Sequence, residues 1–86
     1  MSRSIKRHIS VIGLGYVGLP VAVSFGKKTE VIGYDINQNR INDLKNGYDA
    51  TGEISSSELA LSKVRFTSNS DEISKADFHI VTVPTP

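Results

Sequence analysis

Six residues at positions 13–18, Gly-Leu-Gly-Tyr-Val-Gly, have the types and spacing to bind a pyrophosphate through backbone N–H groups. Gly13 allows a sharp turn out of a strand, and Gly15 has no side chain to keep phosphates away from the backbone. Gly18 lets the following helix lie close to its strand. We expect that helix to begin at about Tyr16 and to direct its free N–H groups and positive dipole end at the phosphates.

Asp35 could bind the ribose of the same dinucleotide, because it ends the next apolar stretch, at the edge where open parallel sheets bind ligands. Its carboxylate would accept hydrogen bonds from the ribose hydroxyls. The simpler alternative is that Asp35 caps a helix that begins near Asn37. Since a carboxylate repels the 2′-phosphate of NADP, the glycines and the acid together favour NAD as the cofactor.

The length of the chain limits it to part of a dinucleotide-binding fold. It has 86 residues, and two βαβαβ halves do not fit into that length. We therefore expect residues 1–86 to form a partial dinucleotide-binding domain. It would be the first half of a doubly wound, Rossmann-type α/β fold, with a parallel sheet and flanking helices.

Composition excludes several other classes of protein. Ten Lys and Arg against nine Asp and Glu give no electrostatic support for nucleic acid or an anionic membrane as a partner. The lack of cysteine excludes disulfide scaffolds and thiolate metal sites. No apolar run approaches the roughly 18 residues of a membrane span, and residues 1–7 lack the apolar core of a signal peptide. We expect a cytoplasmic protein.

Short apolar runs alternate with amphipathic stretches along the chain, which is typical of βαβ units. Strands are predicted at 9–12, 31–34, 64–67 and 78–83. Helices or helical turns are predicted to begin near Tyr16, Asn37, Ser55 and Ser70. Right-handed crossovers then give the strand order third, second, first, fourth. The fourth strand would be an open edge, and we expect self-association through it.

Three stretches of the sequence carry a resemblance to a known family. The glycine run continues as Leu19-Pro20, residues 33–37 read Gly-Tyr-Asp-Ile-Asn before Arg40, and residues 83–86 read Val-Pro-Thr-Pro. Together they resemble the amino-terminal segment of the UDP-glucose/GDP-mannose dehydrogenase family. With the loop Asp-Ala-Thr-Gly-Glu at 49–53, the chain is most similar to the branch that oxidises UDP-N-acetylhexosamines for capsule, Vi-type or O-antigen polysaccharides.

The resemblance implies oxidation of the C6 alcohol of a UDP-sugar to a carboxylate. Such enzymes use two NAD molecules in turn and pass through a thiohemiacetal and a thioester on a cysteine. The cysteine and its helper residues, with the catalytic and sugar-binding domains, would follow Pro86. These 86 residues alone are therefore expected to lack activity, although the parent enzyme, expected to be a homo-oligomer, would be active.

The resemblance also assigns cofactor contacts to particular residues. The phosphate turn would consist of Gly13, Gly15 and Gly18, with the backbones of Tyr16 and Val17 at the pyrophosphate.

Asp35 would hold the adenosine ribose, and Arg40 would reach the same ribose or pair with Asp35. Thr85 would lie near the nicotinamide ribose. Other interpretations stay open: Arg40 could pair with a neighbouring acid or meet the 2′-phosphate of NADP, and Thr85 could be a turn residue between prolines.

Two other functions are compatible with the same residues. One is a non-catalytic NAD-sensing regulatory module, which would use the same glycine turn and acid. The other is a different NAD-dependent dehydrogenase of related fold, acting on a hydroxyacyl or sugar-acid substrate. Neither His8 nor His79 is expected to act as an acid or base. His8 precedes a strand at the amino edge, opposite the ligand side, and His79 lies within a strand with no acid beside it in sequence.

Overall fold

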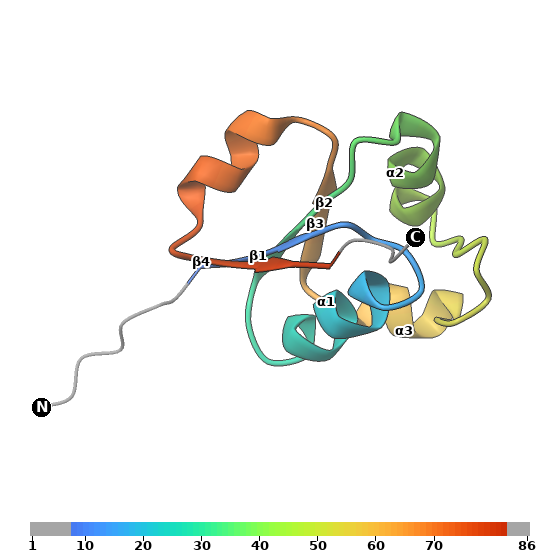
Figure 1. The fold of residues 1–86 in the computed structure, drawn as a ribbon. Coiled ribbons are helices and arrows are strands. Elements are labelled where there is room, and N and C mark those ends of the chain that lie inside the picture. The colour runs from blue at the N-terminus through green and yellow to red at the C-terminus, as the bar shows by residue number, and fades with distance from the viewer. Residues whose placement is uncertain (1–7, 83–86) are drawn as a thin grey trace, which may run out of the picture.

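The computed structural model describes residues 8–82, in which four strands form one parallel sheet. The order across the sheet is β3-β2-β1-β4, which confirms the predicted arrangement. Figure 1 shows β4 returning to lie beside β1, on the side away from β3. The strands are β1 (Ile9–Ile12), β2 (Val31–Tyr34), β3 (Val64–Thr67) and β4 (Phe78–Val81).

Three α-helices and one 3₁₀ helix connect the strands. They are α1 (Gly18–Gly26), α2 (Gln38–Lys45), α3 (Ser56–Leu61) and η1 (Ser70–Lys75). None of these helices is long and apolar enough to cross a membrane, the longest of those described having nine residues. The fold is therefore the Rossmann-type α/β arrangement that the alternating pattern predicts.

The hydrophobic core lies on one face of the sheet, where all three α-helices contribute to it. Its buried members come from β1, β2, β3, the α-helices and the glycine turn: Val11, Leu14, Leu19, Ala22, Val23, Val31, Ile41, Leu44, Leu59 and Phe66. The 3₁₀ helix lies on the other face. This follows because Arg65, whose side chain alternates with the core-facing Val64 and Phe66, forms an ion pair with Glu72 of η1.

Local caps fix the second and third helices as the sequence predicts. The Asn37 side chain accepts a hydrogen bond from the Arg40 N–H (3.2 Å), and Gly47 has a φ of +83° just beyond the end of α2. Asn46 and Gly47 thus end a helix and do not form a hairpin turn. Ser55 Oγ accepts from the Glu58 N–H (3.2 Å), which confirms one half of the predicted capping box.

The predicted start of the first helix is wrong by two residues. Residues 15–17 form a turn, and α1 begins at Gly18. Val17 occupies the N-cap position without a side-chain cap, and Pro20 has no N–H to donate to the Tyr16 carbonyl oxygen, so the continuous run of helical residues starts only at Gly18. The Gly15 carbonyl still accepts the Leu19 N–H (3.2 Å), so the glycine run leads directly into the helix.

Strand β4 ends earlier than predicted, at Val81, and among the described residues it pairs only with β1. Two of its apolar side chains are exposed, Phe78 by 53% and Val81 by 62%. Val83, the predicted last residue of this strand, lies outside the described residues. The outer side of β4 therefore presents unpaired backbone groups next to apolar side chains.

A polypeptide of these 86 residues is expected to associate with itself through β4, because the open strand can pair with a second copy. Sedimentation velocity over increasing concentration should show a growing dimeric or larger species. Val81→Lys should shift the population toward monomer. Leu61→Lys, which changes an equally exposed apolar residue on α3, is the control and should not. A monomer at all concentrations, or the same response to both substitutions, would contradict the expectation.

Candidate functional site

The glycine turn lies at the carboxyl end of β1, and its first and third glycines are required by the protein's own packing. Gly13 has a φ of +96°, and a Cβ built there would lie 1.9 Å from the Thr82 carbonyl oxygen. A Cβ at Gly18 would lie 1.7 Å from the Gly13 carbonyl oxygen. The sharp turn and the close helix packing therefore both depend on the absence of a side chain.

Gly15 differs from the other two glycines because nothing lies within 4 Å of a Cβ built on it. The packing of the described residues does not explain a glycine at this position. The open space in front of its backbone fits the predicted approach of a pyrophosphate. The contact itself stays a prediction, as do the backbone contacts of the exposed residues Tyr16 and Val17.

Thr82 supports the turn from the neighbouring strand. Its hydroxyl donates a hydrogen bond to the Gly13 carbonyl oxygen (2.6 Å), and its N–H donates to the Ile12 carbonyl oxygen (2.8 Å). The sequence analysis missed this contact, which joins residues 69 positions apart. The only signal was the position of Thr82 at the end of the fourth apolar run. Thr85, the predicted contact to the nicotinamide ribose, lies outside the described residues.

Asp35 lies just beyond β2 and holds the glycine turn through its carboxylate. Oδ2 accepts a hydrogen bond from the Leu14 N–H and Oδ1 accepts one from the Asn37 N–H, both at 2.9 Å. The N-cap of α2 is Asn37, so the alternative in which Asp35 caps the start of this helix is wrong. Each carboxylate oxygen has a second lone pair, so Asp35 can still accept hydrogen bonds from a ribose.

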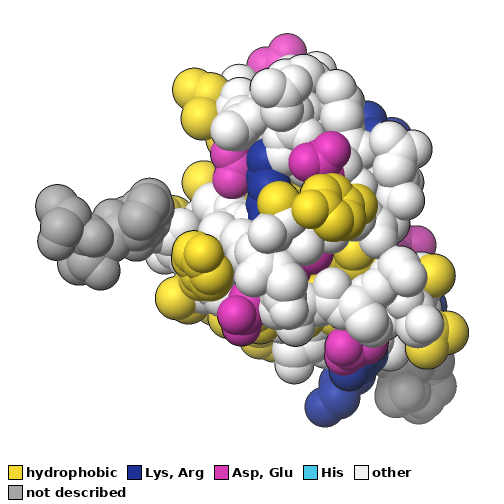
Figure 2. Space-filling model, turned by 90° about the vertical axis from the view of Figure 1, so that its right-hand side faces the viewer, with side chains coloured by type: hydrophobic (Ala, Val, Ile, Leu, Met, Phe, Trp, Pro, Cys, Tyr) yellow, Lys and Arg dark blue, Asp and Glu magenta, His cyan; other side chains and the backbone are white. Residues whose placement is uncertain are grey.

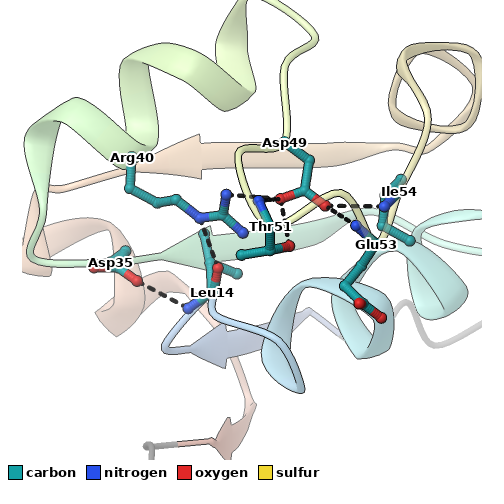
Figure 3. Close-up of polar contacts among 7 residues, drawn as sticks. All are labelled: Leu14, Asp35, Arg40, Asp49, Thr51, Glu53 and Ile54. Atoms are coloured by element: carbon teal, nitrogen blue, oxygen red, sulfur yellow. Dashed lines mark hydrogen bonds and ion pairs between the residues drawn. The ribbon is translucent and has the colours of Figure 1, made fainter.

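Arg40 reaches the Leu14 backbone from α2, as Figure 3 shows. Its Nε donates to the Leu14 carbonyl oxygen (2.8 Å), and its Nη1 donates to Asp49 Oδ1 (2.8 Å). Of the two roles implied for Arg40, the pairing with Asp35 does not form, because backbone N–H groups hold both Asp35 oxygens and the loop after α2 brings Asp49 to the guanidinium. The role at the ribose stays a prediction. The neighbouring acid left open as an alternative is Asp49.

One nitrogen of Arg40 is left over. Nη2 is buried and has no hydrogen-bond partner among residues 8–82. A buried guanidinium donor without a partner is costly, so such a group favours binding of an acceptor. A ribose hydroxyl oxygen is an acceptor of the kind this donor needs. Because the protein covers Nη2, a ribose could reach it only after a local movement, and the contact of Arg40 with a ribose stays a prediction.

Asp49 is a functional candidate that the sequence analysis left within a loop. Its side chain is fully buried, and it accepts hydrogen bonds from the Thr51 N–H and hydroxyl (2.9 and 2.7 Å) and from the N–H groups of Glu53 and Ile54 (2.9 Å each). Burial alone raises the pKa of this carboxyl. The hydrogen bonds from Thr51, Arg40 and the backbone outweigh burial and hold the pKa well below its usual value.

The spacing Asp-x-Thr gave a weak local signal for this loop, since Asp side chains often bind the backbone two residues on. It could not show that the acid would be buried against Arg40. Figure 2 shows the side of the molecule that carries α2 and α3. Acidic and basic side chains lie next to one another there, and apolar side chains are scattered over the same face.

A second feature, a cavity of about 570 Å³, lies at the opposite end of the strands. It lies beside η1 and is lined by residues that include His8, Glu30, Lys63 and Glu72. None of the predicted site residues lines it. Because ligands of open α/β sheets bind at the carboxyl ends of the strands, we place the candidate site at the glycine turn and not in this cavity.

Comparison with known proteins gives the same reading of the whole chain. Residues 7–86 match the model of the UDP-glucose/GDP-mannose dehydrogenase family, NAD binding domain. The chain is 56% identical over 81 residues to protein CapL of Staphylococcus aureus, covering 94% of this chain and 19% of CapL. It is 53% identical over 79 residues to UDP-N-acetyl-D-glucosamine 6-dehydrogenase of Pseudomonas aeruginosa, covering 91% of this chain and 19% of that enzyme.

Solved structures agree in fold. The structure of UDP-D-ManNAc dehydrogenase from Pyrococcus horikoshii superposes with a TM-score of 0.81 at 33% identity, covering 92% of this chain and 20% of that one. The chain thus spans about a fifth of the length of the relatives it matches.

Two glycines of the turn, Gly15 and Gly18, are expected to respond differently to alanine. Gly18→Ala should lower the free energy of unfolding by about 3 kcal/mol, because the added methyl overlaps the Gly13 carbonyl. Gly15→Ala should change it by less than about 0.5 kcal/mol but weaken NAD binding about tenfold or more. Urea unfolding and calorimetry with NAD on the natural full-length protein measure the two effects. Unchanged NAD affinity in Gly15→Ala would contradict the assigned role.

Asp49→Asn is expected to lower the free energy of unfolding at pH 7 by about 3 kcal/mol, because Arg40 loses its charged partner and two N–H groups lose an acceptor. The native pKa of Asp49 lies below the unfolded value of about 3.9. Its stabilisation is therefore complete above about pH 4 and declines as the pH falls further.

Urea unfolding at several pH values should show the difference between Asp49→Asn and the original protein narrowing below about pH 4. Asp71→Asn, which removes an exposed acid on η1, is the matched control and should cost less than about 0.5 kcal/mol. A difference that widens on acidification would refute the assignment.

Proposed function

Since the chain belongs to the UDP-glucose/GDP-mannose dehydrogenase family and matches its NAD binding domain, we propose that it is the NAD-binding segment of a nucleotide-sugar 6-dehydrogenase. The parent enzyme would oxidise the C6 alcohol of a UDP-sugar to a carboxylate. The catalytic and sugar-binding domains would lie outside residues 1–86. The chain has no cysteine, so a cysteine nucleophile would have to come from those domains.

The observation that carries this proposal is the Leu14 backbone held between Asp35 and Arg40, next to the open space at Gly15. The Asp35 carboxylate, which already accepts from the Leu14 N–H, offers further acceptor sites there, which suits the hydroxyl groups of a ribose. The open space suits a pyrophosphate. Both features belong to the described residues.

The arrangement of the described residues supports most of the predicted NAD contacts, and the family match supports Thr85, which lies outside them. Backbone N–H groups of the glycine turn, including those of Tyr16 and Val17, would bind the pyrophosphate at the start of α1. Asp35 and Arg40 would bind the adenosine ribose, and Thr85 would contact the nicotinamide ribose. When bound, NAD supplies the hydride acceptor of the reaction, while this segment orients it.

For the substrate, we propose a UDP-N-acetylhexosamine. Support comes from two relatives whose names both give a UDP-N-acetylhexosamine as substrate. UDP-N-acetyl-D-glucosamine 6-dehydrogenase of Pseudomonas aeruginosa is 53% identical to the chain, and UDP-N-acetyl-D-mannosamine dehydrogenase of Escherichia coli is 38% identical. The product would serve the synthesis of a surface polysaccharide. A cytoplasmic location and a homo-oligomeric parent complete the proposal.

Turnover of the natural full-length protein with a panel of UDP-sugars and NAD tests this function. We expect two NADH per molecule of UDP-N-acetylhexosamine and little turnover of UDP-glucose. One NADH per substrate would indicate a different dehydrogenase. NAD binding without turnover of any nucleotide sugar would indicate a regulatory NAD-sensing module.

A further inference from the structure

The ion pair of Arg40 and Asp49 lies next to the acid that would bind the ribose. Asp35 Oδ2 accepts from the Leu14 N–H (2.9 Å), and Arg40 Nε donates to the Leu14 carbonyl oxygen (2.8 Å). The carboxylate and the guanidinium are thus separated by a single residue (Figure 3). Any group held by Asp35 lies within the electrostatic influence of Arg40.

An arginine and an acid at this position favour different cofactors. An acid accepts a hydrogen bond from the 2′-hydroxyl of NAD, whereas a nearby arginine accommodates the 2′-phosphate of NADP. This chain carries both, as Asp35 and Arg40. Which cofactor the pair favours depends on whether the positive charge of Arg40 is free to contact the 2′-phosphate of NADP.

The structure restrains Arg40 in both position and charge. Its side chain is 11% exposed, Nε is bound to Leu14, and Nη1 is bound to the fully buried carboxylate of Asp49 at 2.8 Å. Asp49 is itself fixed by the backbone of the loop that follows it. The guanidinium therefore cannot move toward a phosphate without leaving a buried charge unpaired, which is costly.

The balance of charges at the site is negative. Arg40 contributes one positive charge, which Asp49 neutralises, and Asp35 adds an unbalanced negative charge. A 2′-phosphate at the ribose would meet this net negative charge, while a 2′-hydroxyl would not.

We propose that Asp49 sets the preference of this site for NAD over NADP, by holding Arg40 in place and neutralising its charge. Asp49 is a positioning residue that acts through Arg40. The inference rests on the proposed NAD site, because it concerns the ribose that Asp35 would bind. A purely structural role would affect both cofactors equally.

The test measures the dissociation constants of NAD and NADP for the natural full-length protein by calorimetry and compares their ratio between variants. The original protein should bind NAD more tightly. Asp49→Asn should lower the NADP-to-NAD ratio of dissociation constants about tenfold, since it removes one negative charge near the phosphate. Arg40→Gln should raise the ratio severalfold, since it leaves Asp49 unbalanced.

Thr51→Val is the matched control, because it removes a hydrogen bond to Asp49 and leaves both charges in place. The NADP-to-NAD ratio of dissociation constants of this variant should stay within about twofold of the ratio of the original protein. Equal weakening of both cofactors in Asp49→Asn, or an equal change of ratio in Thr51→Val, would overturn the inference. If Asp49→Asn does not fold, an unchanged or lower ratio in Arg40→Gln would overturn it. Failure of the original protein to bind NAD would instead overturn the proposed function.

Discussion

Both polar groups of the Leu14 backbone are bound by charged side chains, and the candidate site depends on this arrangement. Asp35 takes the N–H and Arg40 takes the carbonyl oxygen, while the Leu14 side chain is fully buried in the core. The glycine turn has no capping side chain of its own, since Val17 stands at the N-cap of α1. Its conformation is therefore fixed from outside, by side chains that follow β2 and begin α2. Hydrogen bonds to charged groups are suited to this because they are stronger than neutral ones.

The parallel sheet makes these contacts possible. Because all four strands run in the same direction, the ends of β1, β2 and β4 meet at one edge, and the turn after β1 meets Asp35 and Thr82 there. The close approaches at Gly13 and Gly18 hold the turn against β4 and α1. Of the three glycines in the turn, only Gly15 faces open space. The contacts that fix the two ends of the turn therefore leave its middle accessible.

Much of the fold could be predicted because its signals are local. The glycine spacing, the Asn37 cap, the positive φ at Gly47 and the Ser55 cap each depend on a few adjacent residues. The strand order also followed, since the handedness of crossovers leaves few alternatives. The first helix starts at Gly18 and not at about Tyr16, because Pro20 has no N–H to continue the helical hydrogen bonds that begin between Leu19 and Gly15.

The partner of Arg40 could not be predicted in the same way. Asp49 lies in a loop whose sequence indicates a turn, and its burial depends on how α2 directs the chain back toward the glycine turn. Thr82 likewise contacts Gly13 only because β4 pairs with β1. By itself, the sequence determined the type of domain, the elements that carry the candidate site and the residues expected to bind a dinucleotide, because these follow from spacing along the chain. Only the tertiary structure decided which charges meet, because buried charges find their partners through contacts between segments that packing alone brings together.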